Sequence, residues 1–473
     1  MGKSYFPSAF GYLLISFLLI FLVYYLGYVV ERSHFSCLLP AYFIFFLLYL
    51  GICFFSEAWN TVLFFLILAI FLRFLLLFSL PNLSDDFFRF IWDGRLINQG
   101  INPFDHLPSY YLQNNRQIPG IDTLLYEQLN SPDYFTIYPP LNQAIFALAA
   151  WISPNDITES SMVMKSFLFV FEVGNILLII SLLRQFRQKV KKVLLYALNP
   201  LIIIETSGNL HFEGGMIFFL LLSIWLLVHK EKLLLSAIAF SFSVCTKLLP
   251  LMFLPLWIRR LKKSKEISVG HNTIKKKLLQ QWENIDRRRV IIYFFSLGMV
   301  TLLLFLPLIN QLFLENLGSS LNYYFQKFEF NASLYYIFRW IGYQLKGYNV
   351  INTLGPLLAL SAFSGILLLA FLEKKPDWQN LFEKMLFVIC IYLFSATTVH
   401  PWYISLPLVC SIFTSFRFPV LWSGLVFLTY INYSYSPYYE NLKMVAIEYL
   451  MVTGFMLFEL RQHSKVLKVS TDQ

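Results

Sequence analysis

Charged residues are scarce in this sequence. Only 14% of the 473 residues are Asp, Glu, Lys or Arg, and 58% are hydrophobic, whereas a soluble domain carries about a quarter charged residues. Apolar runs of roughly twenty residues, long enough to cross a bilayer, recur along most of the chain. The shortage of charge therefore argues against a soluble protein and predicts an all-α polytopic membrane protein.

The sequence also lacks the short motifs of several common enzyme classes. It contains no Walker-type phosphate loop and no GxGxxG, GxSxG or HExxH motif, so nucleotide hydrolysis and the common hydrolase chemistries have no support. The five cysteines lie in apolar runs, and no two have the spacing of a metal site. We expect them to pack inside helices.

The apolar runs predict one membrane domain, residues 1–473, built as a bundle of about eleven to fourteen transmembrane helices. The predicted segments are 10–30, 37–55, 59–80, 141–153, 162–183, 193–206, 214–229, 233–258, 290–309, 350–372, 385–399, 401–416, 418–433 and 442–460. The segment 141–153 is short and bracketed by prolines, so it can also be a re-entrant element. The segment 233–258 contains Pro250 and Pro255, which predict a broken hairpin with Lys247 near its turn.

Lysine and arginine predict which loops face the cytoplasm. Loop 259–289 holds eleven basic and three acidic residues, and 184–192 is a second basic cluster, so both are expected to be cytoplasmic. Loop 81–139 has seven acidic and three basic residues and is predicted to be a helical extracytoplasmic first loop. Because orientation accounts for the net charge of +10, no nucleic-acid partner is expected.

On this topology, six polar segments converge on one side of the membrane. Polar groups at membrane depth are costly and usually mark a functional cavity. The segments are "SDDFFRFIWDGR" (84–95), "YPPLNQ" (138–143), "ETSGNLHFEGG" (205–215), Lys247, "FEFNASLYYIFRW" (328–340) and "TTVHPWY" (397–403).

The first segment has a structural and a functional interpretation. Ser84 can cap a helix whose first turn holds Asp85 and Asp86, and Asp85, Arg89 and Asp93 can form a ladder of ion pairs four residues apart. Alternatively, one of the adjacent aspartates can deprotonate an acceptor hydroxyl while Arg89 keeps its partner ionised. The spacing does not decide between the two.

The next candidates are His211, Glu213, Lys247 and Tyr138. His211 and Glu213 can share a polar network, contact a phosphate, or hold a divalent metal if His400 or an aspartate supplies a third ligand. Lys247 can extend its ammonium group to the interface, or it can bind an anion such as a phosphate. Tyr138, beside two prolines, can stiffen a helix start or reach a ligand.

The remaining candidates lie late in the chain. His400, Trp402 and Tyr403 can form an interfacial aromatic belt, or they can stack on a sugar and contact a phosphate. Arg339 can be a solvated loop charge or a phosphate ligand.

The order of these motifs resembles the integral-membrane glycosyltransferases of the GT-C type, in particular bacterial mannosyltransferase-like members that use polyprenyl-phosphate sugars. The likeness runs from about residue 60 to 433. It rests on "SDDFFRFIWDG…GINPF", "YPPL", "NPLIIIETSGN.HFEG", "TKLLPLMFLPL" and "HPWY", in that order. The acidic pair here is adjacent, whereas some relatives have one residue between the two acids.

The resemblance implies a hexosyltransferase that moves a sugar, mannose by family likeness, from a lipid phosphate to a glycan or glycolipid acceptor, with inversion. It implies that Asp85 or Asp86 is the general base, oriented by Arg89, and that Lys247, His211, Arg339 and His400 are candidates for the donor phosphate. The lipid-linked sugar is a donor substrate, no cofactor is assigned, and a divalent metal stays an alternative that the sequence does not support. The implied location is the bacterial cytoplasmic membrane, with the site facing outward.

Two other functions remain possible at this stage. A lipid or polysaccharide transporter would show inverted repeats and charges near the bilayer midplane, whereas no such repeat is visible here and the charges cluster at one interface. A polysaccharide polymerase or ligase would share the lipid-linked donor but lack the early aspartate pair.

Overall fold

The regular structure of the protein is helical. The computed structural model describes residues 9–113, 117–262 and 283–471, and within these ranges it contains two isolated β-bridges and no strand. The α-helices are α1 Ala9–Tyr24, α2 Phe35–Phe55, α3 Trp59–Leu75, α4 Asp86–Asn98, α5 Thr123–Glu127, α6 Pro140–Ile152, α7 Ile157–Gln185, α8 Leu194–Ala197, α9 Glu213–Val228, α10 Leu233–Thr246, α11 Leu254–Ile258, α13 Arg287–Phe305, α14 Phe313–Gln326, α15 Leu334–Lys346, α16 Ile351–Phe371, α17 Leu381–Ser395, α18 Ser405–Ile412, α19 Phe418–Leu425 and α20 Leu442–Thr471.

Six helices of the described residues are long and apolar enough to cross a bilayer. They span Phe10–Val29, Phe35–Phe55, Trp59–Phe78, Ile157–Gln185, Arg287–Leu308 and Ile351–Phe371. A seventh candidate is a pair bent by 105°, made of the π-helix η5 (Ile202–Gly208) and α9. The prediction of an all-α polytopic membrane protein is confirmed.

Several predicted spans form shorter helices. Leu233–Thr246, Leu249–Ile258 and Pro401–Ile412 are apolar but too short to pass the same test. The predicted count of about eleven to fourteen spans therefore exceeds the six or seven that pass it. The hairpin predicted at 233–258 is indeed broken at Lys247, whose backbone is extended. Helix α6 has 13 residues, about 20 Å at 1.5 Å per residue, so it is too short to span a bilayer alone.

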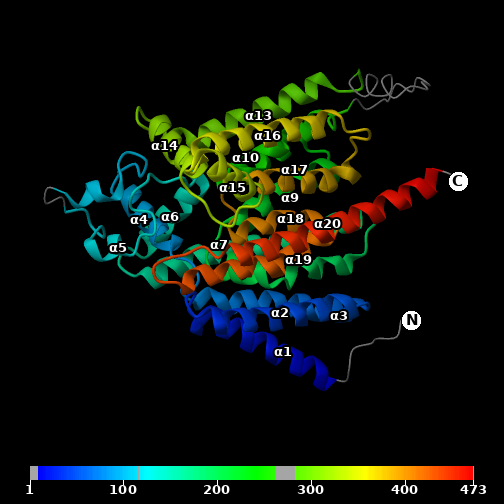
Figure 1. Ribbon diagram of the computed structural model, residues 1–473, viewed down its shortest axis with the longest axis horizontal. Coiled ribbons are helices and arrows are strands. Elements are labelled where there is room, and N and C mark those ends of the chain that lie inside the picture. Colours follow the sequence, from blue (N-terminus) through cyan, green and yellow to red (C-terminus); the bar gives the residue numbers. More distant parts are fainter. Residues whose placement is uncertain (1–8, 114–116, 263–282, 472–473) are drawn as a thin grey trace.

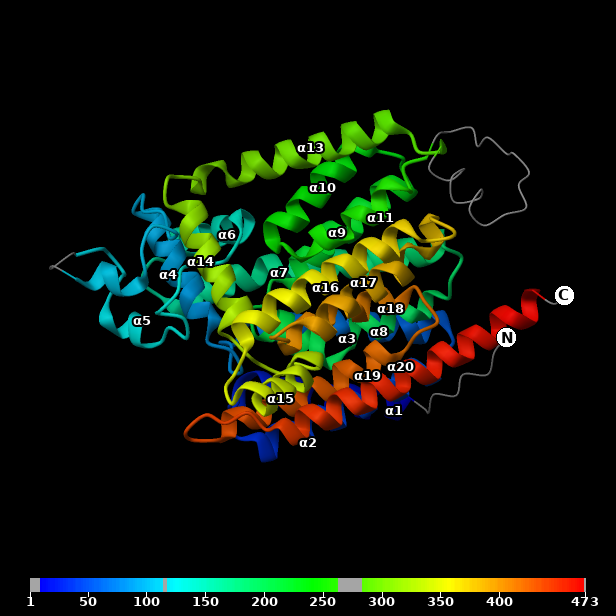
Figure 2. The same ribbon diagram turned by 45° about the horizontal axis from the view of Figure 1, so that its top comes forward.

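The chain's polar loops gather at the two ends of the helix bundle. Helices α4, α5 and α6 lie at one end of the long axis, here called the site end, and the C-terminal end of α20 lies at the other (Figures 1 and 2). At the opposite end, Lys191 pairs with Glu57 and the Arg184 guanidinium lies 5.9 Å from the Trp59 ring centroid. The basic cluster 184–192 thus packs beside the α2–α3 turn.

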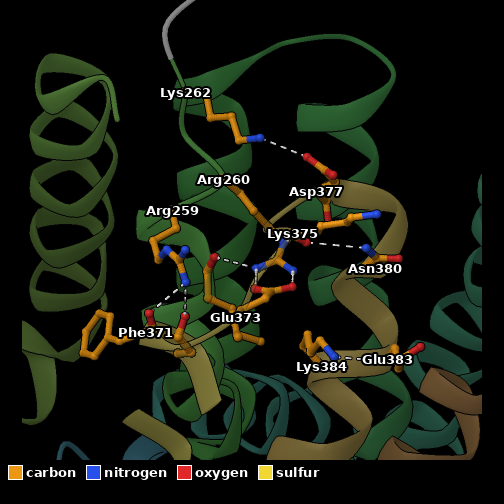
Figure 3. Close-up of polar contacts among 12 residues, drawn as sticks. Arg259, Arg260, Lys262, Phe371, Glu373, Lys375, Asp377, Asn380, Glu383 and Lys384 are labelled. Atoms are coloured by element: carbon orange, nitrogen blue, oxygen red, sulfur yellow. Dashed lines mark hydrogen bonds and ion pairs between the residues drawn. The ribbon is translucent and has the colours of Figure 1, made fainter. Parts of the chain in front are cut away.

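A second group of charges closes the opposite end of the bundle. Arg260 forms a buried two-pronged pair with Glu373, at 2.7 and 2.9 Å, and Arg259 donates to the last carbonyls of α16, as Figure 3 shows. Such planar pairing joins the end of α11 to the α16–α17 connection. These residues begin the predicted basic loop 259–289, of which 263–282 lie outside the described residues, as do 114–116 of loop 81–139.

Candidate active site

Helix α4 is held at the site end by close packing on α6. A Cβ atom added at Gly94 would lie 2.2 Å from the carbonyl oxygen of Phe146, so only glycine permits this approach. The Phe90 ring stacks on the Phe146 ring at 4.5 Å, and the Tyr138 ring meets Phe90 edge-on at 4.8 Å. This packing fixes the start of α4, where the aspartate pair lies.

The hydrogen-bond partners of Arg89 lie outside the aspartate pair that it is predicted to orient. The guanidinium is buried and donates to Asp93 at 2.9 Å and to the carbonyl oxygens of Ser131 and Tyr134. Asp93 accepts a further hydrogen bond from Gln143 at 3.0 Å. Of the predicted ladder, only the Arg89–Asp93 half forms, and it fastens α4 to the following loop and to α6.

Asp85 is instead paired with an arginine from a distant turn. It occupies the capping position of α4, one residue later than the predicted cap Ser84, whose hydroxyl accepts from the Asp86 amide at 3.3 Å. The Asp85 carboxylate pairs with Arg32, in the turn between α1 and α2. The Arg32 guanidinium also lies over the Tyr433 ring at 4.9 Å. Arg32 therefore compensates the charge of Asp85. The two contacts of Arg32 join the start of α4, the turn between α1 and α2, and the segment around Tyr433.

Asp86 has no lysine or arginine partner among the described residues. One carboxylate oxygen accepts from Asn130 at 2.6 Å, and the other lies 3.7 Å from Nε2 of His211. The side chain is 21% exposed and opens into a small pocket. The pocket is lined by Asp86, Arg89, Asn130, Ser131, Tyr134, Phe135, Thr136, Ile137 and Tyr138. A carboxylate without a fixed cation at a pocket wall can accept a proton.

His211 belongs to a set of stacked aromatic rings. The Trp402 ring stacks on His211 at 3.6 Å and on His400 at 4.5 Å, and Phe330 stacks on His400 at 5.0 Å. His400 lies in the turn before the 3-10 helix η9 (Pro401–Ile404). Burial, with smaller contributions from His211 and Lys247, lowers the pKa of His400 to about 3. His400 would therefore meet a phosphate as a neutral hydrogen-bonding group.

Lys247 finds its counter-charge in Glu213. The ammonium group pairs with the fully buried carboxylate of Glu213, at the start of α9, and lies 5.1 Å from the ring centroid of Tyr403. The lysine keeps 21% of its side chain exposed. Glu213 thus faces Lys247, while His211 faces Glu205 and Asp86. The suggested His211–Glu213 metal pair does not form, and the described residues contain no group of three His, Cys, Asp or Glu side chains that could hold a metal ion.

The segment 328–340 joins the site through its backbone. Phe330 bridges Thr398, and the Val399 amide donates to the Phe330 carbonyl at 2.8 Å. Arg339, which lies on α15, instead pairs with Glu329 and covers the Tyr336 ring at 4.3 Å. Direct contacts thus join all six predicted segments. The Arg339 side chain itself contacts Glu329 and Tyr336 and none of the stacked rings of His211, Trp402, His400 and Phe330.

A family comparison indicates the class of reaction. Residues 35–261 match the sequence model of the family described as alpha-(1->6)-mannopyranosyltransferase, N-terminal domain. The match covers 227 of the 473 residues, just under half of the chain, and over this segment the chain is similar to that family. No curated protein and no solved structure matched the chain. The protein is accordingly a membrane-embedded hexosyltransferase of the mannosyltransferase type, with a sugar donor and a glycan acceptor as its substrates.

The matched segment of this mannosyltransferase includes Asp85, Asp86, His211 and Lys247. Three residues of the site were missed by sequence reasoning: Arg32, Asn130 and Glu205. A signal existed for Arg32, because the predicted topology puts the charged turn "ERSH" (31–34) on the same side as loop 81–139. Glu205 opens the segment "ETSGNLHFEGG" (205–215), but only its contacts in the structure distinguish its role from that of Glu213.

Proposed function

We propose that this mannosyltransferase moves mannose from a polyprenyl-phosphate donor to an acceptor hydroxyl, with inversion, at the outward face of a bacterial cytoplasmic membrane. The main support for the proposal is that several residues of the site lie next to one another. The Asp86 carboxylate, beside a pocket, lies 3.7 Å from Nε2 of His211, whose ring stacks on Trp402, and Lys247 lies over the ring of the neighbouring Tyr403. A proton acceptor and a cation are thereby available at the same end of an apolar bundle.

Asp86 suits the role of base better than Asp85. The Asp85 carboxylate is already neutralised by Arg32, so it would give up an ion pair on accepting a proton. Asp86 accepts one hydrogen bond from an uncharged amide and faces the pocket. A base in a partly buried site needs access to the substrate hydroxyl and freedom to become neutral. The geometry supports Asp86 on both points.

Lys247 supports a lipid-linked donor. It lies where the apolar hairpin 233–258 breaks, and its side chain is 21% exposed. We infer that its ammonium group lies at membrane depth, because the two halves of the hairpin are apolar. A phosphate carried on a lipid chain would reach that depth without leaving the bilayer. The ammonium group would stabilise the charge that develops on the phosphate as it departs, which is commonly a large part of the rate.

The transfer step moves one proton, forms one bond to C1 of mannose and breaks another. Asp86 takes the proton of the acceptor hydroxyl, the acceptor oxygen bonds to C1 of mannose, and the bond from C1 to the phosphate oxygen breaks. Polyprenyl phosphate leaves with the bonding electrons. Attack opposite to the leaving group inverts C1, so an α-linked product, as the family name indicates, needs a β-linked donor.

The donor class tests this proposal directly. We expect purified protein in lipid vesicles to transfer radiolabelled mannose from synthetic polyprenyl-phosphate mannose to octyl α-mannopyranoside. We expect no transfer from GDP-mannose, because the chain lacks a nucleotide-binding motif. Transfer from GDP-mannose, with none from the lipid phosphate, would contradict the proposed donor. Heat-treated vesicles and vesicles without protein are the controls.

A further inference from the structure

Glu205 holds the ring of His211 through one nitrogen. Glu205 is fully buried in η5, and its carboxylate accepts from Tyr430 at 2.6 Å and from Asn209 at 3.1 Å. Nδ1 of His211 lies 3.2 Å from the same carboxylate and 3.0 Å from the backbone carbonyl oxygen of Glu205. Since both neighbours of Nδ1 are acceptors, Nδ1 carries the ring proton of the neutral imidazole.

The other nitrogen of His211 is aimed at Asp86. Nε2 is buried and has no hydrogen-bond partner within the described structure. Its nearest charged atom is the Asp86 oxygen at 3.7 Å, longer than a hydrogen bond. Two acceptors facing each other without a proton between them are expected to stand apart in this way. A proton placed on Asp86 would bridge the gap.

The backbone beside His211 is strained, which indicates that the surrounding packing fixes the orientation of the imidazole ring. Leu210 is fully buried and has a φ of 64°, a left-handed conformation that side chains other than glycine rarely adopt. Such a conformation persists only where the surrounding packing holds it in place. It occurs in the bend between η5 and α9, directly before His211. The bend turns the imidazole toward α4.

We propose that His211 and Glu205 are positioning residues that relieve Asp86 of the proton it takes from the acceptor. The O–H bond formed on Asp86 breaks, an N–H bond forms at Nε2, and Asp86 becomes a carboxylate again. The imidazolium is stabilised by the buried Glu205 carboxylate and by Trp402 stacked on its ring. The proton returns to solvent after the products leave. This inference rests on the proposed function, because it needs Asp86 as the base.

The sequence-based alternative, in which His211 contacts the donor phosphate, makes a different kinetic prediction. A phosphate contact contributes to donor binding, so its loss would raise the donor KM. A residue that acts through Asp86 changes only what happens after the substrates are bound, so its loss lowers kcat at unchanged donor KM.

Two variants test the proposal in the reconstituted full-length protein, with polyprenyl-phosphate mannose and octyl α-mannopyranoside. Glu205→Gln keeps the shape but removes the charge, and His211→Gln keeps an amide near Nε2 but removes the basic ring. We expect each to lower kcat by about 30-fold, the usual scale for an outer partner of an active group, with the donor KM within about threefold of wild type. If one variant does not fold, the other carries the test.

Tyr430→Phe is the matched control. It removes a hydrogen bond from the same Glu205 carboxylate but leaves the contact with His211, so kcat should stay within about threefold of wild type. Wild-type kcat in both glutamine variants, or a raised donor KM with unchanged kcat, would overturn the proposal. Either result leaves the proposed function standing, provided that wild type is active and Asp86→Asn is not. No transfer by wild type would instead refute the proposed function.

Discussion

Replacing Asp86 with asparagine is expected to lower kcat by about 1,000-fold, within the usual range for loss of a general base. The amide keeps the volume and can still contact Asn130, but it cannot accept the proton of the acceptor hydroxyl. Donor and acceptor KM values should change little, because the carboxylate acts in the transition state. The measurement is initial-rate transfer in vesicles, with thermal melting to verify the fold.

Asp85→Asn is the matched control for this substitution. It changes the neighbouring residue in the same way, but it removes an ion pair with Arg32 at a site about one-third exposed. Such pairs contribute modestly to stability, so kcat should stay within about tenfold of wild type. An inactive Asp85→Asn beside an active Asp86→Asn would reverse the assignment of the base.

Replacing Lys247 with methionine is expected to lower kcat/KM for polyprenyl-phosphate mannose by about 100-fold. Methionine keeps most of the apolar length but removes the charge proposed to meet the donor phosphate, and groups of this kind commonly contribute such factors. It also leaves the Glu213 carboxylate buried without its cation, which would repel an anionic donor. The donor dependence of the transfer rate measures the effect.

Lys191→Met is the comparison for Lys247. Lys191 also pairs with a glutamate, Glu57, but at the end of the bundle opposite the site. Its loss should leave kcat/KM unchanged within about twofold, because surface pairs contribute little. Equal losses for both variants would mean that the Lys247 effect reflects stability and not donor binding.

The helices were largely predictable from the sequence because the bilayer imposes a simple rule. Long apolar runs must form helices that satisfy their own backbone, so 10–30, 37–55 and 59–80 correspond closely to the helical segments that end at Val29, Phe55 and Phe78. The break at Lys247 was also predictable, since an apolar run that contains a lysine and two prolines rarely continues as one helix.

The partners of the charged residues were not predictable, because local spacing offers only neighbours on the same helix. Spacing favours Asp85, Arg89 and Asp93 as one ladder, yet Asp85 pairs with Arg32, 53 residues earlier. In the same way, His211 is two residues from Glu213 but contacts Glu205, because the chain bends between η5 and α9. Long-range packing decides these pairs.

The stacking of His211, Trp402 and His400 was also not predictable from the sequence. The sequence indicates that both motifs face the same side of the membrane, but it cannot tell an aromatic belt from rings in mutual contact. The distances of 3.6 and 4.5 Å decide for contact. The two motifs are about 190 residues apart, so only the folded bundle brings them together.

Inverting transfer from a lipid phosphate can be tested by following the mannose and the lipid in the same reaction. Wild-type protein is given β-linked polyprenyl-phosphate mannose and octyl α-mannopyranoside, and the disaccharide and the released lipid are analysed by NMR and mass spectrometry. We expect an α-linked disaccharide and one polyprenyl phosphate released per mannose transferred. A β-linked product, or movement of the intact donor across the bilayer with no disaccharide formed, would contradict it.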